Sequence, residues 1–201
     1  MRPASFVTKV GSTAAGPGGR SETLLFSEPE VGATLRTRGR LYLLCEVDPP
    51  SQRGFEMAQE VSELARHDYY YDLSAGIEVA LRRALRQANR RASQELRDDR
   101  GRIRLHCACA VIVNNEVYAA RIGNAQVFLV RHARLFLPGD EPDELADFVH
   151  RTTARHAASL GSEPDLLPTV WRQALDAGDT IILASGGVVE APFGGVKESG
   201  V

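Results

Sequence analysis

The longest apolar pattern of the sequence lies between Leu105 and Leu137 and consists of four short runs separated by turn residues. The runs are rich in residues that favour β-strands, and the dipeptides Asn114-Asn115 and Gly123-Asn124 favour tight turns. The runs cover residues 107–113, 117–122, 127–130 and 135–137. This pattern predicts a four-strand antiparallel meander. Because the runs are almost continuously apolar, we expect both faces of this sheet to be covered.

Further elements are predicted on both sides of this segment. Apolar runs predict strands at residues 4–10, 24–26, 40–47 and 180–184, the last of them buried. Helical spacing of apolar residues predicts helices over residues 54–71, 74–96 and 143–160. Ser74 is a suitable N-cap for the second helix, and Gly161 is a suitable C-cap for the third.

Length and charge restrict the classes of function. The chain has 201 residues, of which 43% are hydrophobic, so it has enough length for one domain with a hydrophobic core. The net charge is -2, and acidic residues are interspersed around the arginine face formed by Arg82, Arg86 and Arg90. We therefore expect a solvated helix face and no nucleic-acid partner. No apolar run reaches membrane-spanning length, so we expect no membrane association.

The cysteines and histidines do not form a recognisable reactive cluster. The three cysteines, Cys45, Cys107 and Cys109, suggest no disulfide framework, so we expect reduced, buried thiols and a cytoplasmic location. The five histidines have no mutual spacing that indicates a zinc site or a general base. We expect them at the surface or at helix ends.

The segment GNAQVFLVR, which begins at Gly123, resembles the "vGDSRaYlyR" block of the metal-dependent Ser/Thr protein phosphatases (PPM type, protein phosphatase 2C). Three other segments resemble blocks of the same family in the same order, "G…R.NED", "lfvVaDGmGGh" and "GDtlLLcSDGl". They lie at residues 11–23, 40–50 and 178–187. The resemblance implies an α+β fold, a four-layer α-β-β-α sandwich of two antiparallel sheets flanked by helices, without the last strand of the family. It assigns residues 1–187 to this domain and residues 188–201 to a truncated or irregular tail, whose sequence is similar to a C-terminal motif of aldehyde dehydrogenases.

The resemblance also implies where a metal site would lie. The metal-site positions of the family correspond to Thr23, Glu46, Val47, Asn124 and Gly186. In active members two metal ions held by aspartates activate a water molecule that attacks the phosphate. Only Glu46 retains a carboxylate at these positions, so we expect no dinuclear metal centre.

Residues beside these positions could supply residual ligands or contact a phosphate. Glu22 and Asp48 could assist Glu46 in holding a single Mg or Mn ion. Arg20 matches the phosphate-contacting arginine of the family. Its guanidinium could hold a phosphate-like anion or a phosphorylated peptide, although pairing with Glu22 or Glu46 is the alternative.

The resulting expectation is a pseudophosphatase, a PPM-like domain with a binding or regulatory role towards a phosphoprotein or signalling protein and without a cofactor. One alternative is a residual metal-dependent Ser/Thr protein phosphatase that uses Glu46 and Glu22. Another is an oligomerising scaffold domain. The sequence does not determine the oligomeric state or the partner.

Overall fold

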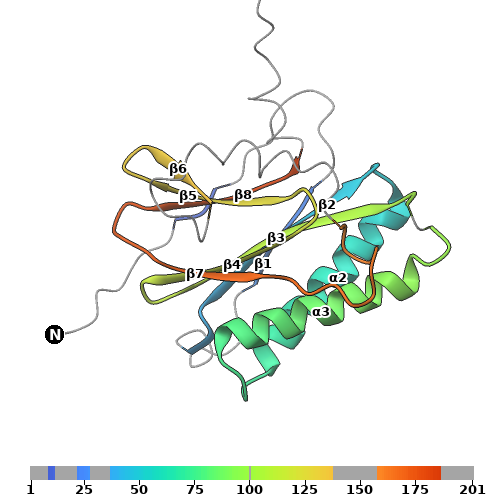
Figure 1. Cartoon of the computed structure of the whole chain (residues 1–201), viewed down its shortest axis with the longest axis horizontal. Helices are drawn as coiled ribbons and strands as arrows, with labels where there is room; N and C mark the ends of the chain where they lie inside the picture. The colour runs from blue at the N-terminus through green and yellow to red at the C-terminus, as the bar shows by residue number, and fades with distance from the viewer. Residues whose placement is uncertain (1–8, 12–21, 28–36, 100, 138–157, 187–201) are drawn as a thin grey trace, which may run out of the picture.

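The computed structural model describes residues 9–11, 22–27, 37–99, 101–137 and 158–186. These residues form eight strands and two helices, labelled as in Figure 1. The strands are β1 (Glu22–Ser27), β2 (Arg40–Asp48), β3 (Arg104–Val113), β4 (Glu116–Ile122), β5 (Gln126–Arg131), β6 (Arg134–Phe136), β7 (Val170–Ala174) and β8 (Thr180–Ala184). The helices are α2 (Gln52–Tyr71) and α3 (Ile77–Glu95).

The strands form two antiparallel sheets that stack on each other, and both helices cover the outer face of the larger sheet (Figure 1). The larger sheet has the strand order β1-β2-β3-β4-β7, and the smaller sheet has the order β6-β5-β8. The fold is therefore α+β with two stacked antiparallel sheets, as predicted. Three predicted segments fall mostly or wholly outside the described residues: the strand at 4–10, the helix at 143–160 and the tail at 188–201. Of these segments the structure describes only residues 9–10 and 158–160, and they are neither strand nor helix.

Strand β3 shows how the larger sheet is buried on both faces. Cys107 and Cys109 lie in the core between this sheet and the helices, whereas Ala108 lies in a second core between the two sheets. Leu44 of β2 and Val127 of β5 belong to the same inter-sheet core. The almost continuous apolar runs of the sequence thus reflect a sheet that is covered on both sides, as predicted.

The predicted four-strand meander is wrong at one step. Strands β3 and β4 form a hairpin, but β4 does not pair with β5. At Gly123, which has a φ of 74°, the chain leaves the larger sheet, and β5 pairs with β6 and β8 in the smaller sheet. On its side away from β3, β4 pairs instead with β7, a strand that the sequence pattern did not predict.

The start of helix α3 also differs from the prediction. The N-cap of α3 is Gly76, which makes no side-chain capping bond, and Ser74 instead donates to the Asp72 carboxylate. Helix α2 has a side-chain N-cap, because Ser51 accepts the backbone N–H of Gly54. Among the described residues, no helix is long and apolar enough to cross a membrane.

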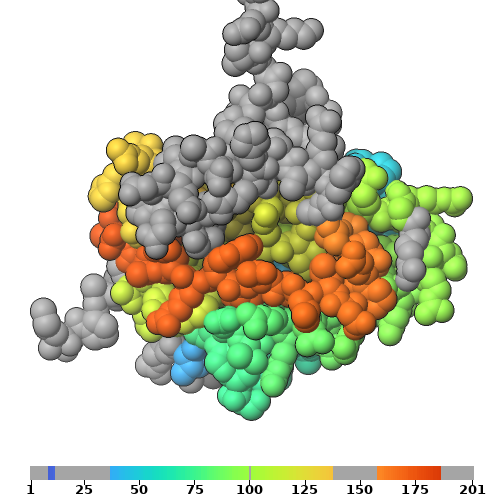
Figure 2. Space-filling view, viewed as in Figure 1, coloured from blue at the N-terminus to red at the C-terminus, as the bar shows by residue number. Residues whose placement is uncertain are grey.

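Residues 158–169 lie along one side of helix α3 and continue into strand β7 (Figure 2). Asn89 of α3 is fully buried and holds this segment by three hydrogen bonds. Its Nδ2 donates to the carbonyls of Glu163 and Pro164, and its Oδ1 accepts the backbone N–H of Gly161. Leu160 donates its N–H to the Leu105 carbonyl in an isolated β-bridge. It was predicted to end a helix, and this prediction is wrong for Leu160.

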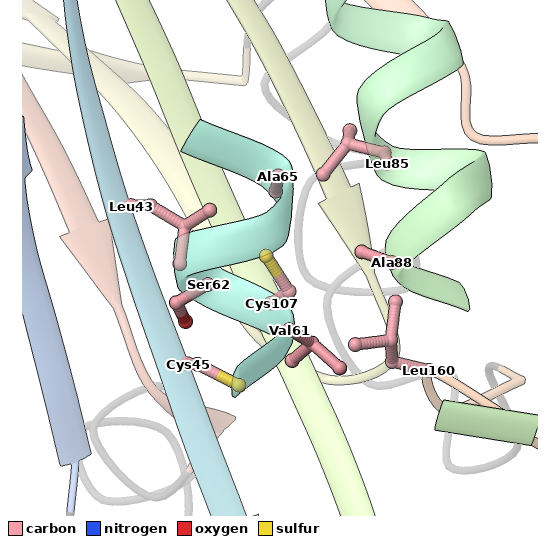
Figure 3. A pocket seen from close by; sticks show the side chains of 9 residues that line it. All are labelled: Leu43, Cys45, Val61, Ser62, Ala65, Leu85, Ala88, Cys107 and Leu160. Atoms are coloured by element: carbon pink, nitrogen blue, oxygen red, sulfur yellow. The ribbon is translucent and has the colours of Figure 1, made fainter. Parts of the chain in front are cut away.

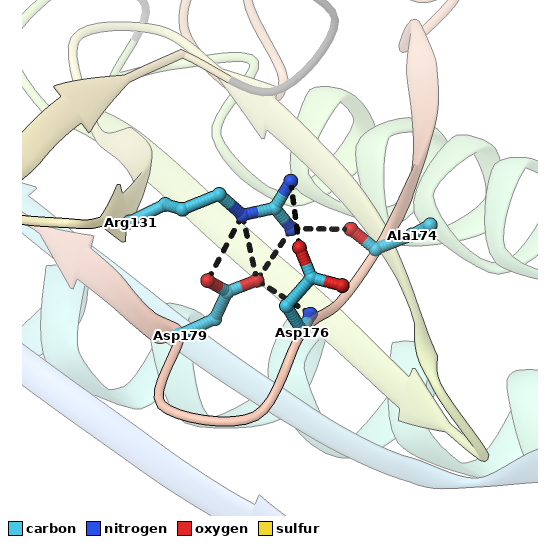
Figure 4. Close-up of polar contacts among 4 residues, drawn as sticks. All are labelled: Arg131, Ala174, Asp176 and Asp179. Atoms are coloured by element: carbon cyan, nitrogen blue, oxygen red, sulfur yellow. Dashed lines mark hydrogen bonds and ion pairs between the residues drawn. The ribbon is translucent and has the colours of Figure 1, made fainter.

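The turn before β8 is fixed by an ion pair with the end of β5 (Figure 4). The Arg131 guanidinium donates to both carboxylate oxygens of Asp179 and to the Ala174 carbonyl, and Asp179 also accepts the Asp176 N–H.

Strand β8 was expected to be fully buried, but Ile182 is 39% exposed. Ile181 and Leu183 pack against the inter-sheet core, whereas Ile182 points to the opposite face of the strand.

Candidate functional site

Glu46 is the charged residue at the centre of the candidate site. It lies near the end of β2, and its side chain is fully buried. Its Oε2 accepts the backbone N–H of Gly186 at 2.9 Å. Because β2 belongs to the larger sheet and Gly186 follows β8 of the smaller sheet, this bond joins the two sheets. A hydrogen bond of this kind offsets part of the cost of burying a carboxylate.

Two other expected positions converge on Glu46. A Cβ atom placed on Gly186 would lie 3.4 Å from Glu46 Oε2 and 3.0 Å from the Asn124 Cβ. Glu46, Asn124 and Gly186 come from three separate segments of the chain, and the fold places them side by side. These three positions therefore supply two functional groups, the carboxylate of Glu46 and the amide of Asn124.

His106 is a buried member of the site that the sequence interpretation missed. It lies directly opposite Glu46 in the β2–β3 register and is 2% exposed, so its predicted location at the surface or a helix end is wrong. Its Nδ1 accepts the backbone N–H of Asn124 at 3.2 Å. This bond assigns the proton of the neutral imidazole to Nε2. The apolar residues on both sides of His106 in β3 were the signal that it is buried.

The ring of His106 lies against the turn that connects the two sheets. A Cβ atom on Gly123 would overlap His106 Nδ1, and Gly123 also has a positive φ of 74°. Both the conformation and the close approach require glycine at this position. The turn therefore places Asn124 in the site and sends the chain into β5.

Val47 does not contribute its side chain to the site, and the Asp48 side chain is paired with an arginine. Val47 is fully buried in the core between the larger sheet and the helices, where it faces Gly54 of α2. Asp48 accepts a hydrogen bond from Arg104 at 2.6 Å. A metal ion at Glu46 would therefore have to compete with Arg104 for the carboxylate of Asp48.

Strand β1 is described only by its backbone. The register places Glu22 directly opposite Glu46, whereas Thr23 lies opposite Cys45. Glu22 is therefore the residue of β1 that is paired with the site, although the resemblance aligned Thr23 with the family aspartate. Arg20 lies outside the described residues.

The three cysteines form no reactive centre. Cys45 and Cys107 line a small apolar cavity between the larger sheet and the helices, together with Ser62 and Leu160 (Figure 3). All three thiols are free and buried, as predicted. Burial raises the pKa of Cys107 to about 12 and that of Cys45 and Cys109 well above the ordinary value. The thiols are therefore protonated at neutral pH and poor nucleophiles or metal ligands.

Solved structures with the same arrangement of sheets and helices identify the fold. No family model and no curated protein matches the sequence. The catalytic domain of the Ser/Thr phosphatase PstP, solved in complex with two manganese ions, matches with a TM-score of 0.58 and 15% identity over 84% of this chain and 72% of that chain. The PPM Ser-Thr phosphatase MsPP from Mycobacterium smegmatis, in complex with cacodylate, matches with a TM-score of 0.56 and 17% identity, over 84% of this chain and 79% of that chain. PppA of Pseudomonas aeruginosa, a regulatory component of T6SS, matches with a TM-score of 0.56 and 14% identity over 84% and 76% of the two chains.

This chain has the PPM phosphatase fold. The result confirms the resemblance at the level of the fold, including the two antiparallel sheets and the helix pair over the larger one. A fold alone does not determine activity, so the chemistry of the site depends on which residues occupy it.

The residues described near Glu46 do not fit a pair of hard divalent cations. Such ions take six or more oxygen ligands, and a dinuclear site needs several carboxylates to offset the charge of the cations. Within the described residues, no group of three or more His, Cys, Asp or Glu side chains is placed to hold a metal ion. Beside Glu46 the PPM-fold positions are occupied by the Asn124 amide and by Gly186, which has no side chain.

Proposed function

We propose that this chain is a PPM-fold domain without a dinuclear metal centre that binds a phosphorylated partner instead of hydrolysing it. The observation that carries the proposal is the bond from the Gly186 N–H to Glu46 Oε2 at 2.9 Å. The carboxylate that could bridge two cations is fully buried and directed at a backbone amide of its own chain. The neighbouring positions, Asn124 and Gly186, supply no further negative charge.

The other groups near Glu46 do not replace the missing chemistry. His106 is buried, and its Nδ1 is engaged by the Asn124 backbone. The cysteine thiols lie on the opposite face of the larger sheet and remain protonated. The described part of the site therefore offers no activated nucleophile for a phosphate ester.

The binding role is supported by the fold and by the chemistry expected of Arg20. A site with fewer carboxylates has a less negative local field, so an anionic ligand could approach without metal ions to neutralise it. A guanidinium can hold a phosphate by two parallel hydrogen bonds. A phosphoprotein or phosphorylated signalling protein is accordingly the class of partner that we propose.

Metal titration followed by a phosphatase assay tests the proposal. We expect calorimetry with Mn²⁺ or Mg²⁺ to detect no tight binding and no hydrolysis of a phosphopeptide panel above the rate without protein. The same panel, titrated into the wild type and into Arg20→Ala, measures binding without turnover. Metal-dependent hydrolysis by the wild type would refute the proposal.

One observation favours a second candidate function, a one-metal phosphatase. Glu22 and Glu46 are register partners on neighbouring strands, so two acidic residues are paired at this position. In this case Glu22→Gln and Glu46→Gln would each abolish any metal-dependent hydrolysis, whereas Asp48→Asn would not. An activity that survives both glutamate substitutions would exclude this mechanism and indicate a contaminating enzyme.

A further inference from the structure

Arg121 is a half-buried arginine of β4 that faces the smaller sheet. Its two neighbours in the strand, Ala120 and Ile122, lie in the core on the helix side. Because successive side chains of a strand point to opposite faces, Arg121 projects into the space between the sheets. Its register partner Ala108 and the nearby Ala119 belong to the inter-sheet core.

The guanidinium of Arg121 has no protein partner within the described part of the chain. No hydrogen bond or ion pair reaches it there, whereas the half-buried Arg131 is held by Asp179 and a carbonyl. The fully buried Arg38 likewise donates to the carbonyls of Ala75 and Asp72. Burial lowers the pKa of Arg121, with no opposing contribution from a carboxylate.

Arg121 nevertheless remains a cation at neutral pH, because a guanidinium loses its proton only at extreme pH. A partly desolvated charge without a counter-ion lowers the stability of a fold. Such a residue is a candidate for ligand binding, because a bound anion would compensate the charge.

The pairing between β4 and its neighbour β7 ends close to Arg121. Strand β7 pairs with β4 only from Glu116 to Ala120, so this pairing ends one residue before Arg121. Thr169, the residue before β7, is exposed. The described part of the larger sheet therefore has no strand beside Arg121 on this side.

We propose that Arg121 binds an oxyanion, a phosphate or a carboxylate group, at the edge of the space between the two sheets. The planar guanidinium presents parallel N–H donors that match two oxygens of either group. Its test does not alter Glu46 or Gly186, and binding of an anion by Arg121 does not require a metal ion at Glu46. The result of this test therefore neither supports nor refutes the function proposed above.

The test compares thermal unfolding of the full chain in potassium chloride, phosphate and acetate at equal pH and ionic strength. Arg121→Met keeps a similar length but removes the charge, Arg121→Lys keeps the charge but removes the fork of donors, and Arg86→Met is the control. Arg86 is also half-buried, on helix α3, and does not face the inter-sheet space. Calorimetric titration with inorganic phosphate and with acetate gives the affinities directly.

We expect Arg121→Met to melt at a higher temperature than the wild type in chloride, because it removes an uncompensated charge. Phosphate or acetate should raise the melting temperature of the wild type and of Arg86→Met but not that of Arg121→Met. Arg121→Lys should bind at least tenfold more weakly than the wild type. An effect of phosphate alone identifies a phosphate site, and an equal effect of acetate identifies a general oxyanion site.

Equal responses of the wild type and Arg121→Met to every anion would overturn the proposal. The same holds if Arg121→Met is less stable than the wild type in chloride, because Arg121 would then be a packing residue. If Arg121→Met fails to fold, calorimetry with Arg121→Lys decides, and an affinity equal to that of the wild type refutes the proposal.

Discussion

Replacing Asn89 with alanine should detach the segment before β7 from helix α3. Asn89 is fully buried, and its Nδ2 lies 2.7 Å from the Glu163 carbonyl and 3.2 Å from the Pro164 carbonyl. Its Oδ1 lies 2.8 Å from the Gly161 nitrogen. A Cβ atom on Gly161 would lie only 2.8 Å from the Ala92 Cβ, so the turn packs directly on the helix.

The expected loss of stability follows from the fate of each polar group. The buried Gly161 N–H loses its one partner among the described residues, and an unsatisfied buried donor costs about 1–3 kcal/mol. Glu163 and Pro164 are exposed, so water can reach their carbonyls, and each lost bond costs about 0.5–1.5 kcal/mol. The better helix propensity of alanine returns at most about 0.7 kcal/mol. We therefore expect a net loss of about 2–4 kcal/mol.

For a chain of this length the loss corresponds to a decrease of roughly 5–15 °C in melting temperature. Urea denaturation and thermal unfolding would measure it, and hydrogen exchange would show faster exchange of the Gly161 amide. Gln94→Ala is the matched control, because Gln94 is an exposed amide on the same helix. The reasoning would be refuted if Asn89→Ala and Gln94→Ala were equally stable and the Gly161 amide kept its protection.

Two further substitutions test local features of the fold. Asp179→Asn should cost about 1.5–3 kcal/mol, because the largely buried carboxylate is held by Arg131. That hydrogen bond is the main cause of the lowered pKa of Asp179, so its stabilisation is present above about pH 4 and is lost as the pH falls through the lowered pKa. A difference from the wild type that persists unchanged to pH 2 would contradict this assignment. Gly123→Ala should destabilise the chain by roughly 1–3 kcal/mol more than Gly101→Ala, because only the first methyl group overlaps another residue, His106. Both glycines have a positive φ, so equal losses would show that the imidazole moves aside without cost.

The hydrophobic pattern was sufficient to locate most strands and both helices. Strand β2 and strand β3 are long apolar runs, and each extends to within a few residues of its predicted bounds. Helix α2 was equally clear from its apolar spacing, and only its first turn lies earlier than predicted. In these segments local propensity and burial favour the same structure, so the sequence alone determines them.

Strand pairing was not predictable in the same way. The runs of β4 and β5 are separated by a turn of the kind that joins hairpin strands, yet they belong to different sheets. Whether β4 pairs with β5 or β7 depends on which pairing buries both sheet faces, and this is a property of the whole fold. Strand β7 itself has polar residues at Arg172 and Gln173, so its sequence carries little strand signal.

The resemblance named positions for the candidate site but did not give the orientation of their side chains. Glu46, Asn124 and Gly186 lie on three separate segments, and the fold brings these segments together. Val47 is adjacent in sequence but faces the opposite core, since neighbouring residues of a strand point to opposite faces. His106 carries no motif, and only its position opposite Glu46 reveals its contact with the site.

The contact between Glu46 and Gly186 has a consequence for how any activity of this site should be interpreted. Several carboxylates in one place repel each other unless a cation lies between them. Here the buried Glu46 side chain accepts the Gly186 N–H, and this hydrogen bond joins the two sheets at this point. Glu46 therefore contributes to the fold whether or not it contributes to chemistry. Glu46→Gln separates the two roles, because the amide oxygen can still accept the Gly186 N–H while the negative charge that a cation requires is removed.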